Sequence, residues 1–251
     1  MKTLQTYGWD ADRTREWANL DFSEYTPARI TADYGHRYKL VLPEEKSAHL
    51  SGALAHKLRA TEMPKIGDWV AVEISDDQSV IIQHVMTRRN EIVRGRVGAL
   101  IDKQVVAANV DVAFIMQPLD HDFSVERLER YLFQLASQDI EAIILLNKSD
   151  KVNDAEEKRE QLHNLDAQVI TISALHDDDV SLIERHIPVG KTAVIIGSSG
   201  AGKSTLTNRL LGEDRQATQE IRERDSKGRH TTVHRELFAL PGGGMMIDTP
   251  G

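Results

Sequence analysis

The chain has 251 residues, of which 40% are hydrophobic, and it contains no cysteine. This length predicts two globular domains of ordinary size, and the lack of cysteine excludes disulfide bonds. A membrane-spanning helix needs about 18 apolar residues, and no apolar run approaches that length. Residues 1–17 are too charged for a secretion signal. We therefore expect a cytoplasmic protein without a membrane partner.

The first part of the chain, residues 1–24, shows no clear strand pattern. Trp9 and Trp17 stand there among charged residues. This composition predicts an N-terminal arm that is mobile or loosely docked.

From Thr26 the pattern changes to short alternating runs rich in Val, Ile and Tyr, separated by Gly, Asp and Pro. Residues 25–98 therefore predict a small antiparallel barrel. An OB-fold of five strands suits this count, and that fold commonly binds oligonucleotides on one face. Few aromatic residues are available for base stacking, and we expect them in the core: Tyr34, Tyr38 and Trp69.

The net charge of −8 lies entirely after residue 100, because residues 1–100 are neutral overall. Nucleic-acid binding would therefore have to rest on local basic surface. The candidates are Arg88, Arg89, Arg94 and Arg96, with Arg37 and Lys39 nearby in sequence. A solvated linker face is an equally good interpretation of this run.

Residues 99–251 alternate between strand-like and helix-like stretches, after an expected connection at residues 97–102. The strand-like runs are 110–116, 141–146, 168–173, 192–197, 234–240 and 244–248. The helix-like stretches are 125–137, 154–165, 180–186 and 204–211. This alternation predicts a doubly wound α/β sheet with ligand loops at the carboxyl ends of its strands.

The first ligand loop carries the motif NKSD, directly after an apolar strand. A carboxylate there can accept two parallel hydrogen bonds from the N1–H and N2–H₂ edge of guanine, which adenine cannot donate. We expect Asp150 to read the base and Asn147 to tie this loop to a phosphate cradle. The aliphatic stem of Lys148 would lie over the flat base. Alone the motif is weak, because such a turn is an ordinary strand exit.

Two shorter motifs follow other strands. The first is Ser173, Ala174 and Leu175, where a small residue would let a backbone N–H approach the O6 atom of the base. The second is DTPG, in which Asp248 can hold a Mg²⁺-bound water and the Gly251 N–H is available to a γ-phosphate.

The most specific signal is GSSGAGKST, which fits the pattern G-x-x-x-x-G-K-[S/T] between a strand-like and a helix-like stretch. Its residues are Gly197, Ser198, Ser199, Gly200, Ala201, Gly202, Lys203, Ser204 and Thr205. The glycines let backbone N–H groups fold inward around phosphate oxygens. Lys203 would reach the β- and γ-phosphates and neutralise charge during catalysis, and Ser204 would give its hydroxyl to Mg²⁺.

The polar stretch 212–235 follows the expected cradle helix, where switch I belongs in a GTPase. Thr231, or less favourably Thr232, could give a second hydroxyl to Mg²⁺ and order the loop around a γ-phosphate. His230 stands beside them, and we hypothesise that it orients the attacking water. An exposed loop histidine is an equally good interpretation.

Together the four motifs indicate GTP or GDP with Mg²⁺. Their order is unusual, because NKSD precedes the phosphate loop by about fifty residues, whereas the phosphate loop comes first in an ordinary GTPase. The nucleotide-binding domain therefore reads as circularly permuted.

These motifs resemble the RsgA/YjeQ family of circularly permuted GTPases that depend on the small ribosomal subunit. The resembling stretches run from about residue 28 to Gly251 and include QVVAANVD at 104–111, DFSVERLERYL at 122–132 and GRHTT at 228–232. The resemblance implies an OB-fold, a permuted GTPase domain and a C-terminal zinc-binding domain with cysteine and histidine ligands. This sequence has no cysteine and stops at Gly251. No zinc site can be assigned, and we expect the chain to be a fragment of a longer protein.

The expected fold is thus α/β, with an OB-fold barrel followed by a circularly permuted P-loop GTPase domain. We expect a monomeric enzyme in which water attacks the γ-phosphate of GTP, slowly until a partner orders the switch. The resemblance implies that this partner is the small ribosomal subunit with its rRNA, during late maturation of that subunit.

Two alternatives remain open. An RNA-binding module whose GTP site only regulates binding would show no turnover but GTP-dependent association with ribosomes. A P-loop ATPase or kinase is disfavoured by NKSD, and its use of ATP would survive the change Asp150→Asn.

Overall fold

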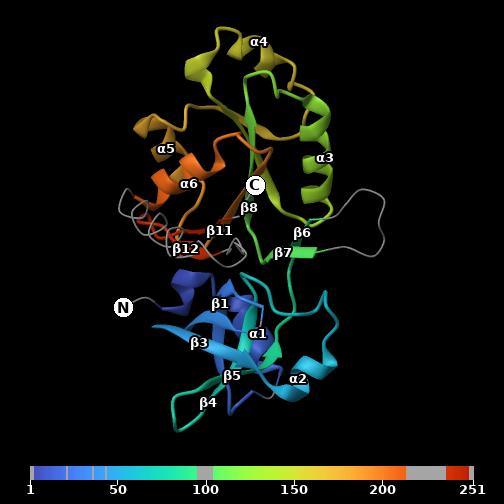
Figure 1. Cartoon of the computed structure of the whole chain (residues 1–251), viewed down its shortest axis with the longest axis vertical. Helices are drawn as coiled ribbons and strands as arrows, with labels where there is room; N and C mark the ends of the chain where they lie inside the picture. Colours follow the sequence, from blue (N-terminus) through green and yellow to red (C-terminus); the bar gives the residue numbers. More distant parts are fainter. Residues whose placement is uncertain are drawn as a thin grey trace, which may run out of the picture.

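The computed structural model describes residues 3–20, 22–35, 37–42, 44–94, 104–212 and 236–248. Its strands form a closed barrel and a separate six-stranded sheet, with a two-stranded ribbon between them along the chain. Figure 1 shows the barrel at one end of the long axis and the sheet with its helices at the other. In the described part of the chain, the helices are too short or too polar to span a lipid bilayer.

The barrel closes in the order β1-β2-β3-β5-β4, with β4 pairing back to β1. Its elements are β1 (Thr26–Asp33), β2 (Tyr38–Leu42), β3 (Glu44–Leu50), α2 (Gly52–Lys57), β4 (Trp69–Ile74) and β5 (Val80–Val85). All pairs are antiparallel except β3 with β5. Apolar residues from every strand fill the interior. The predicted five-stranded barrel is confirmed, and Tyr38 and Trp69 are buried as expected, whereas Tyr34 is only partly buried.

The N-terminal arm is packed against the barrel, so the prediction of a loosely docked arm is wrong. It forms the 3-10 turn η1 (Leu4–Tyr7) and the helix α1 (Ala11–Ala18). Trp9 lies edge-on to Trp69 of the barrel, with 4.9 Å between ring centroids. Arg13 is 2% exposed and donates to the Thr87 carbonyl and to Asn109 Oδ1, each at 2.7 Å. Aromatic burial and these polar contacts hold the arm in place.

Two of the proposed basic-surface residues are engaged with the protein's own carboxylates. Arg88 lies 2.8 Å from the fully buried Asp68, and Arg89 lies 2.6 Å from Asp10. Arg88 thus pairs with a buried carboxylate of the barrel and Arg89 pairs with a carboxylate of the arm, so the charges of both arginines are offset within the protein. Lys39 likewise pairs with Glu45, at 2.6 Å. Arg37 is exposed, whereas Arg96 lies outside the described residues, as does the expected connection at residues 97–102.

The six-stranded sheet has the order β10-β9-β8-β11-β13-β12, and all neighbours are parallel except β12 with β13. Its strands are β8 (Val112–Pro118), β9 (Glu141–Asn147), β10 (Gln168–Thr171), β11 (Thr192–Gly197), β12 (Leu237–Ala239) and β13 (Met245–Ile247). The ribbon before it pairs β6 (Glu91–Arg94) with β7 (Gln104–Ala108). The six predicted strands are confirmed.

Helices cover both faces of this sheet, as a doubly wound fold requires. They are α3 (Val125–Ala136), α4 (Ala155–Glu160), α5 (Asp177–Glu184) and α6 (Lys203–Leu211). Alternate strand residues face two cores: Ile115 and Ile144 lie in the core that includes residues of α3, while Phe114 and Ile143 lie in the core that includes residues of α5 and α6. The predicted helix 154–165 is shorter than expected. The predicted helix 180–186 begins three residues earlier, where Asp177–Asp179 supply negative charge to its first turn.

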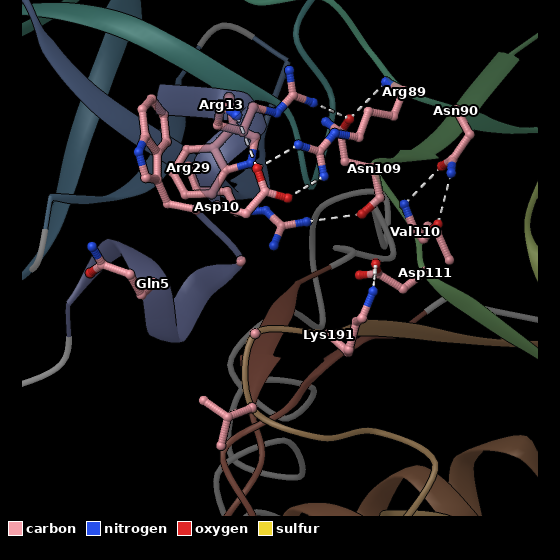
Figure 2. A pocket seen from close by; sticks show the side chains of 15 residues that line it. Gln5, Asp10, Arg13, Arg29, Arg89, Asn90, Asn109, Val110, Asp111 and Lys191 are labelled. Atoms are coloured by element: carbon pink, nitrogen blue, oxygen red, sulfur yellow. Dashed lines mark hydrogen bonds and ion pairs between the residues drawn. The ribbon is translucent and has the colours of Figure 1, made fainter. Parts of the chain in front are cut away.

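The barrel meets the sheet through buried polar contacts. Arg29 of β1 is 2% exposed and donates to the carbonyls of Tyr7, Gly67 and Asn109 and to the sulfur of Met245 in β13. A cavity of about 290 Å³ opens beside it, and Figure 2 shows the arginine side chains around this cavity together with Lys191 from the sheet domain. Residue Ala32 of β1 also forms an antiparallel bridge with Glu236, next to β12. The barrel therefore contacts the sheet at its edge strand β12, which pairs with β13, the strand that Asp248 follows.

Candidate functional site

The glycine-rich loop connects the end of β11 to the start of α6, as predicted. Gly197 and Gly202 have φ angles of +147° and +103°, a region that favours glycine. A Cβ atom at Gly197 would lie 2.2 Å from the Met116 carbonyl oxygen, and one at Gly202 would lie 2.3 Å from Asn147 Nδ2. The loop can approach its neighbours this closely only because both positions are glycine.

Lys203 is the first residue of α6 and is 9% exposed. Its Nζ donates to the carbonyl oxygens of Gly197 and Ser198, at 2.9 and 2.7 Å. The ammonium group is thus held over the loop by the loop's own backbone. Ser204 and Thr205 follow on the exposed side of the first helical turn. A cation, a helix N-terminus and exposed hydroxyls together form a site suited to a phosphate group.

Asn147 connects three loops of the site. It is 3% exposed at the end of β9, where its Nδ2 donates to the Ala201 carbonyl at 2.8 Å and its Oδ1 accepts from the Ala174 N–H at 2.9 Å. The first bond reaches the glycine-rich loop and the second reaches the Ser-Ala-Leu loop after β10. The predicted contact between the NKSD loop and the glycine-rich loop is therefore present.

The residues after Asn147 turn toward the surface. Lys148 has a φ angle of +67°, and its Nζ lies 2.7 Å from Asp120 Oδ2. Asp150 is exposed within the short 3-10 turn η2 (Ser149–Lys151). An exposed carboxylate at this edge is accessible to a polar ligand, and the fixed lysine stem provides an apolar surface beside it.

The Ser-Ala-Leu loop combines a buried anchor with an exposed tip. Ser173 and Ala174 are buried, whereas Leu175 is 56% exposed. The Ser173 N–H donates to Asp179 Oδ2 at 2.7 Å, and the Leu175 N–H donates to Ser173 Oγ at 3.4 Å. The loop is therefore held in one conformation beside Asn147.

Asp248 follows β13 and lies close enough to Lys203 for the charge of that lysine to affect its pKa. Burial raises the pKa of Asp248 above its ordinary value, the charge of Glu236 raises it further, and the charge of Lys203 opposes both. The carboxylate of Asp248 and the exposed hydroxyl of Ser204 are oxygen donors of the kind Mg²⁺ prefers. No group of three or more acidic, histidine or cysteine side chains suited to a metal occurs among the described residues. That is compatible with Mg²⁺, which keeps several waters and binds phosphates.

Four predicted site residues lie outside the described residues: His230, Thr231, Thr232 and Gly251. The structure brings together the remaining ones around the carboxyl ends of β9, β10 and β11, with Asp248 after β13. Sequence reasoning missed Asp120 and Asp122, which follow β8. The available signal was their position, because β8 lies between β9 and β11 and its carboxyl end opens onto the same edge.

The fold is shared with two solved structures. YjeQ from Thermotoga maritima matches with a TM-score of 0.67 at 19% identity, over 90% of this chain and 75% of that one. YloQ, described as a circularly permuted GTPase, matches with a TM-score of 0.63 at 22% identity, over 92% of this chain and 73% of that one. These likenesses support the permuted fold, in which the strand carrying NKSD precedes the strand leading into the phosphate loop.

Comparison of the sequence with known proteins identifies the family as well as the fold. The family model of the RsgA GTPase matches residues 85–251. The chain is similar to two proteins named small ribosomal subunit biogenesis GTPase RsgA. The one from Opitutus terrae is 37% identical over 99% of this chain and 71% of the relative. The one from Xanthomonas oryzae pv. oryzae is 38% identical over 99% of this chain and 70% of the relative. With a family match over more than half of its length and these identities, the chain belongs to the RsgA GTPase family.

Proposed function

We propose that this chain hydrolyses GTP to GDP and phosphate during the late maturation of the small ribosomal subunit. The observation that carries the proposal is the position of Asn147, which bonds to Ala201 of the phosphate loop and to Ala174 of the third loop. One side chain thereby holds the proposed phosphate, base and O6-reading loops in a fixed relation. The names of the curated relatives supply the ribosomal context.

Each residue of the site has a proposed role in that reaction. Asp150 accepts hydrogen bonds from the N1–H and N2–H₂ groups of guanine. The stem of Lys148 packs on the base, and the backbone N–H of Ala174 contacts O6. Lys203 and the N–H groups of the phosphate loop, residues 197–205, hold the β- and γ-phosphates.

Mg²⁺, when bound, would supply positive charge to the phosphate oxygens. We propose that Ser204 and Thr231, or Thr232, donate hydroxyl oxygens to it and that Asp248 holds one of its waters. For His230 we propose that it orients the attacking water, and for Gly251 that its N–H contacts the γ-phosphate.

The partner and domain assignments are also proposals. We propose that residues 25–98 form the RNA-binding domain, that residues 99–251 form the GTPase domain and that residues 1–24 are a docked arm. We also propose that the barrel binds rRNA of the small subunit and that the protein is cytoplasmic and monomeric. We assign no zinc site to this chain.

Hydrolysis of GTP and ATP, each with and without purified small ribosomal subunits at fixed Mg²⁺ and salt, tests the proposal. Stimulation that requires both GTP and the small subunit is expected. If ATP is hydrolysed equally well, the base assignment is wrong. If GTP promotes binding to the subunit without any turnover, the chain is an RNA-binding module with a regulatory nucleotide site.

A further inference from the structure

The loop between β8 and α3, residues 119–124, places two carboxylates toward the proposed nucleotide site. We name it the brace loop. Its Asp122 accepts a hydrogen bond of 2.5 Å from Ser198 Oγ in the phosphate loop, and its Asp120 lies 2.7 Å from Lys148 Nζ in the base loop. One short segment therefore contacts both halves of the site.

The contact with the phosphate loop is oriented by a second partner. Asp122 Oδ1 accepts from Arg127 Nη1 at 2.9 Å, which leaves Oδ2 for the Ser198 hydroxyl. These two hydrogen bonds, with Ser198 and then Arg127, lower the pKa of Asp122. The carboxylate is thus held charged, and the positive guanidinium offsets its repulsion of a nearby phosphate.

Ser198 is held at both ends. Its hydroxyl donates to Asp122, while its carbonyl accepts from Lys203 Nζ at 2.7 Å. Lys203 is the residue proposed to reach the phosphates. The Ser198 carbonyl, together with the Gly197 carbonyl, therefore sets where that lysine is held before a ligand enters.

The contact with the base loop is organised in the same way. Asp120 Oδ1 accepts from the Asp122 N–H at 3.1 Å, and the bond from Lys148 is the largest cause of the lowered pKa of Asp120. This ion pair fixes the end of the Lys148 side chain, and with it the stem that we propose packs on guanine.

The brace loop is itself anchored to the sheet. The Leu119 N–H donates to the carbonyl of Asn147, the last residue of β9, at 2.9 Å. The buried Gln117 of β8 donates through Nε2 to the Asp122 carbonyl at 2.8 Å. Strands β8 and β9 are neighbours in the sheet. The two carboxylates are therefore presented from a rigid support and not from a free surface loop.

We propose that Asp122 and Asp120 are positioning residues for the nucleotide, Asp122 for the phosphate loop through Ser198 and Asp120 for the base loop through Lys148. This inference rests on the proposed nucleotide site. Neither carboxylate needs to touch the ligand, since each acts through the residue that it holds. Their loss should therefore weaken nucleotide binding while leaving the fold intact.

A double-mutant cycle tests the phosphate side of the proposal. The affinity for a fluorescent GDP analogue is measured for the parent, Asp122→Ala, Ser198→Ala and the double variant, with Mg²⁺ constant. Each single variant should bind about tenfold more weakly, and the double variant should be no weaker than either one, because both remove the same charge-assisted hydrogen bond. Ser198→Thr keeps a hydroxyl and should restore most of the affinity.

The base side is tested with Asp120→Ala, which should also bind GDP about tenfold more weakly. The exposed carboxylate Asp166 provides a matched control, because Asp166→Ala removes the same charge away from the site. Unfolding by denaturant is measured for all variants without nucleotide, so that a loss of affinity can be separated from a loss of fold.

The outcomes separate this inference from the function on which it rests. If the folded parent does not bind GDP, the proposed nucleotide site is wrong. If the parent binds GDP but Asp122→Ala and Asp120→Ala bind it equally well, the brace loop has no positioning role. The same conclusion follows if the effects of Asp122→Ala and Ser198→Ala simply add, or if affinity falls only in proportion to stability.

Discussion

The hydroxyl of Tyr34 donates a hydrogen bond of 3.1 Å to Glu236 Oε1. Tyr34 follows strand β1 of the barrel, and Glu236 lies directly before β12 of the sheet. The Glu236 carbonyl in turn accepts from the Asp248 N–H at 3.0 Å. Two hydrogen bonds through Glu236 thus connect the barrel to Asp248. We propose that the barrel binds RNA and that the Asp248 carboxylate holds a Mg²⁺-bound water.

This connection predicts that Tyr34→Phe weakens the response of the GTPase to the small ribosomal subunit. The change removes one hydroxyl, so the basal rate should stay within about twofold of the parent, while the stimulated rate falls several-fold because binding at the barrel biases Asp248 less. Single-turnover hydrolysis with and without subunits measures both rates. Tyr25→Phe is the control, since it removes a hydroxyl elsewhere on the barrel side. Equal stimulation of parent and Tyr34→Phe would exclude this route.

A second prediction concerns Arg88, which the sequence suggested for RNA binding. It pairs with Asp68, which is fully buried and whose pKa is raised by that burial although Arg88 opposes the shift. Arg88→Ala would remove the guanidinium that pairs with this buried carboxylate and leave it the Lys65 N–H as a hydrogen-bond donor. We therefore expect the free energy of unfolding to fall by about 3–5 kcal/mol. Urea denaturation measures this loss, and the exposed Arg37→Ala should change stability by less than about 0.5 kcal/mol.

The pH dependence of that loss follows from Asp68. Without Arg88, its folded-state pKa lies further above the unfolded value, so the folded variant binds more protons than the unfolded chain in that range. Stability of Arg88→Ala should therefore decline as the pH rises through the window between the two pKa values, and the deficit against the parent should be smaller in acid. A deficit that is the same at every pH would mean that Arg88 acts by packing alone.

The sheet could be predicted from the sequence because its central strands are buried on both faces. Such strands appear as continuous apolar runs, as at 141–146 and 192–197, and the motifs at their carboxyl ends share one edge. The contact of Asn147 with the phosphate loop could be predicted for the same reason.

Other features depend on pairings between residues far apart in the sequence. In the sequence, Arg13 is one of several charged residues in a polar segment. In the structure it is buried and donates hydrogen bonds to Thr87 and Asn109. The partner of Asp122 could not be assigned until the strand order put β8 beside β11. Charged residues are ambiguous in sequence because the same side chain can be solvated or buried with a partner.

A third prediction concerns Asp248, whose pKa is raised by burial and by the charge of Glu236. Ionising this carboxylate in the folded protein is unfavourable, so at neutral pH Asp248→Asn should increase the free energy of unfolding, while GTP hydrolysis should be lost. The folded pKa is above the unfolded one, so the parent loses stability as the pH rises through that window, and the variant does not. Thermal unfolding between about pH 4 and pH 7 measures the difference. A less stable Asp248→Asn protein would contradict this account.

The last prediction tests how the base is recognised. Asp150 is exposed in the turn after Asn147, where we propose that it accepts hydrogen bonds from both N1–H and N2–H₂ of guanine. Asparagine can accept from N1–H through its oxygen, but its amide N–H₂ faces another N–H₂ group, so Asp150→Asn should bind GTP about a hundredfold more weakly. Xanthine carries a carbonyl oxygen in place of that amino group, and the asparagine amide can donate to it. The variant should therefore bind xanthosine triphosphate more tightly than the parent does. Competition of both nucleotides against a fluorescent GDP analogue gives the two affinities, with Asp166→Ala as control. A uniform loss for both nucleotides would mean that Asp150 supports the loop without reading the base, because only a direct contact with the 2-position can reverse the preference.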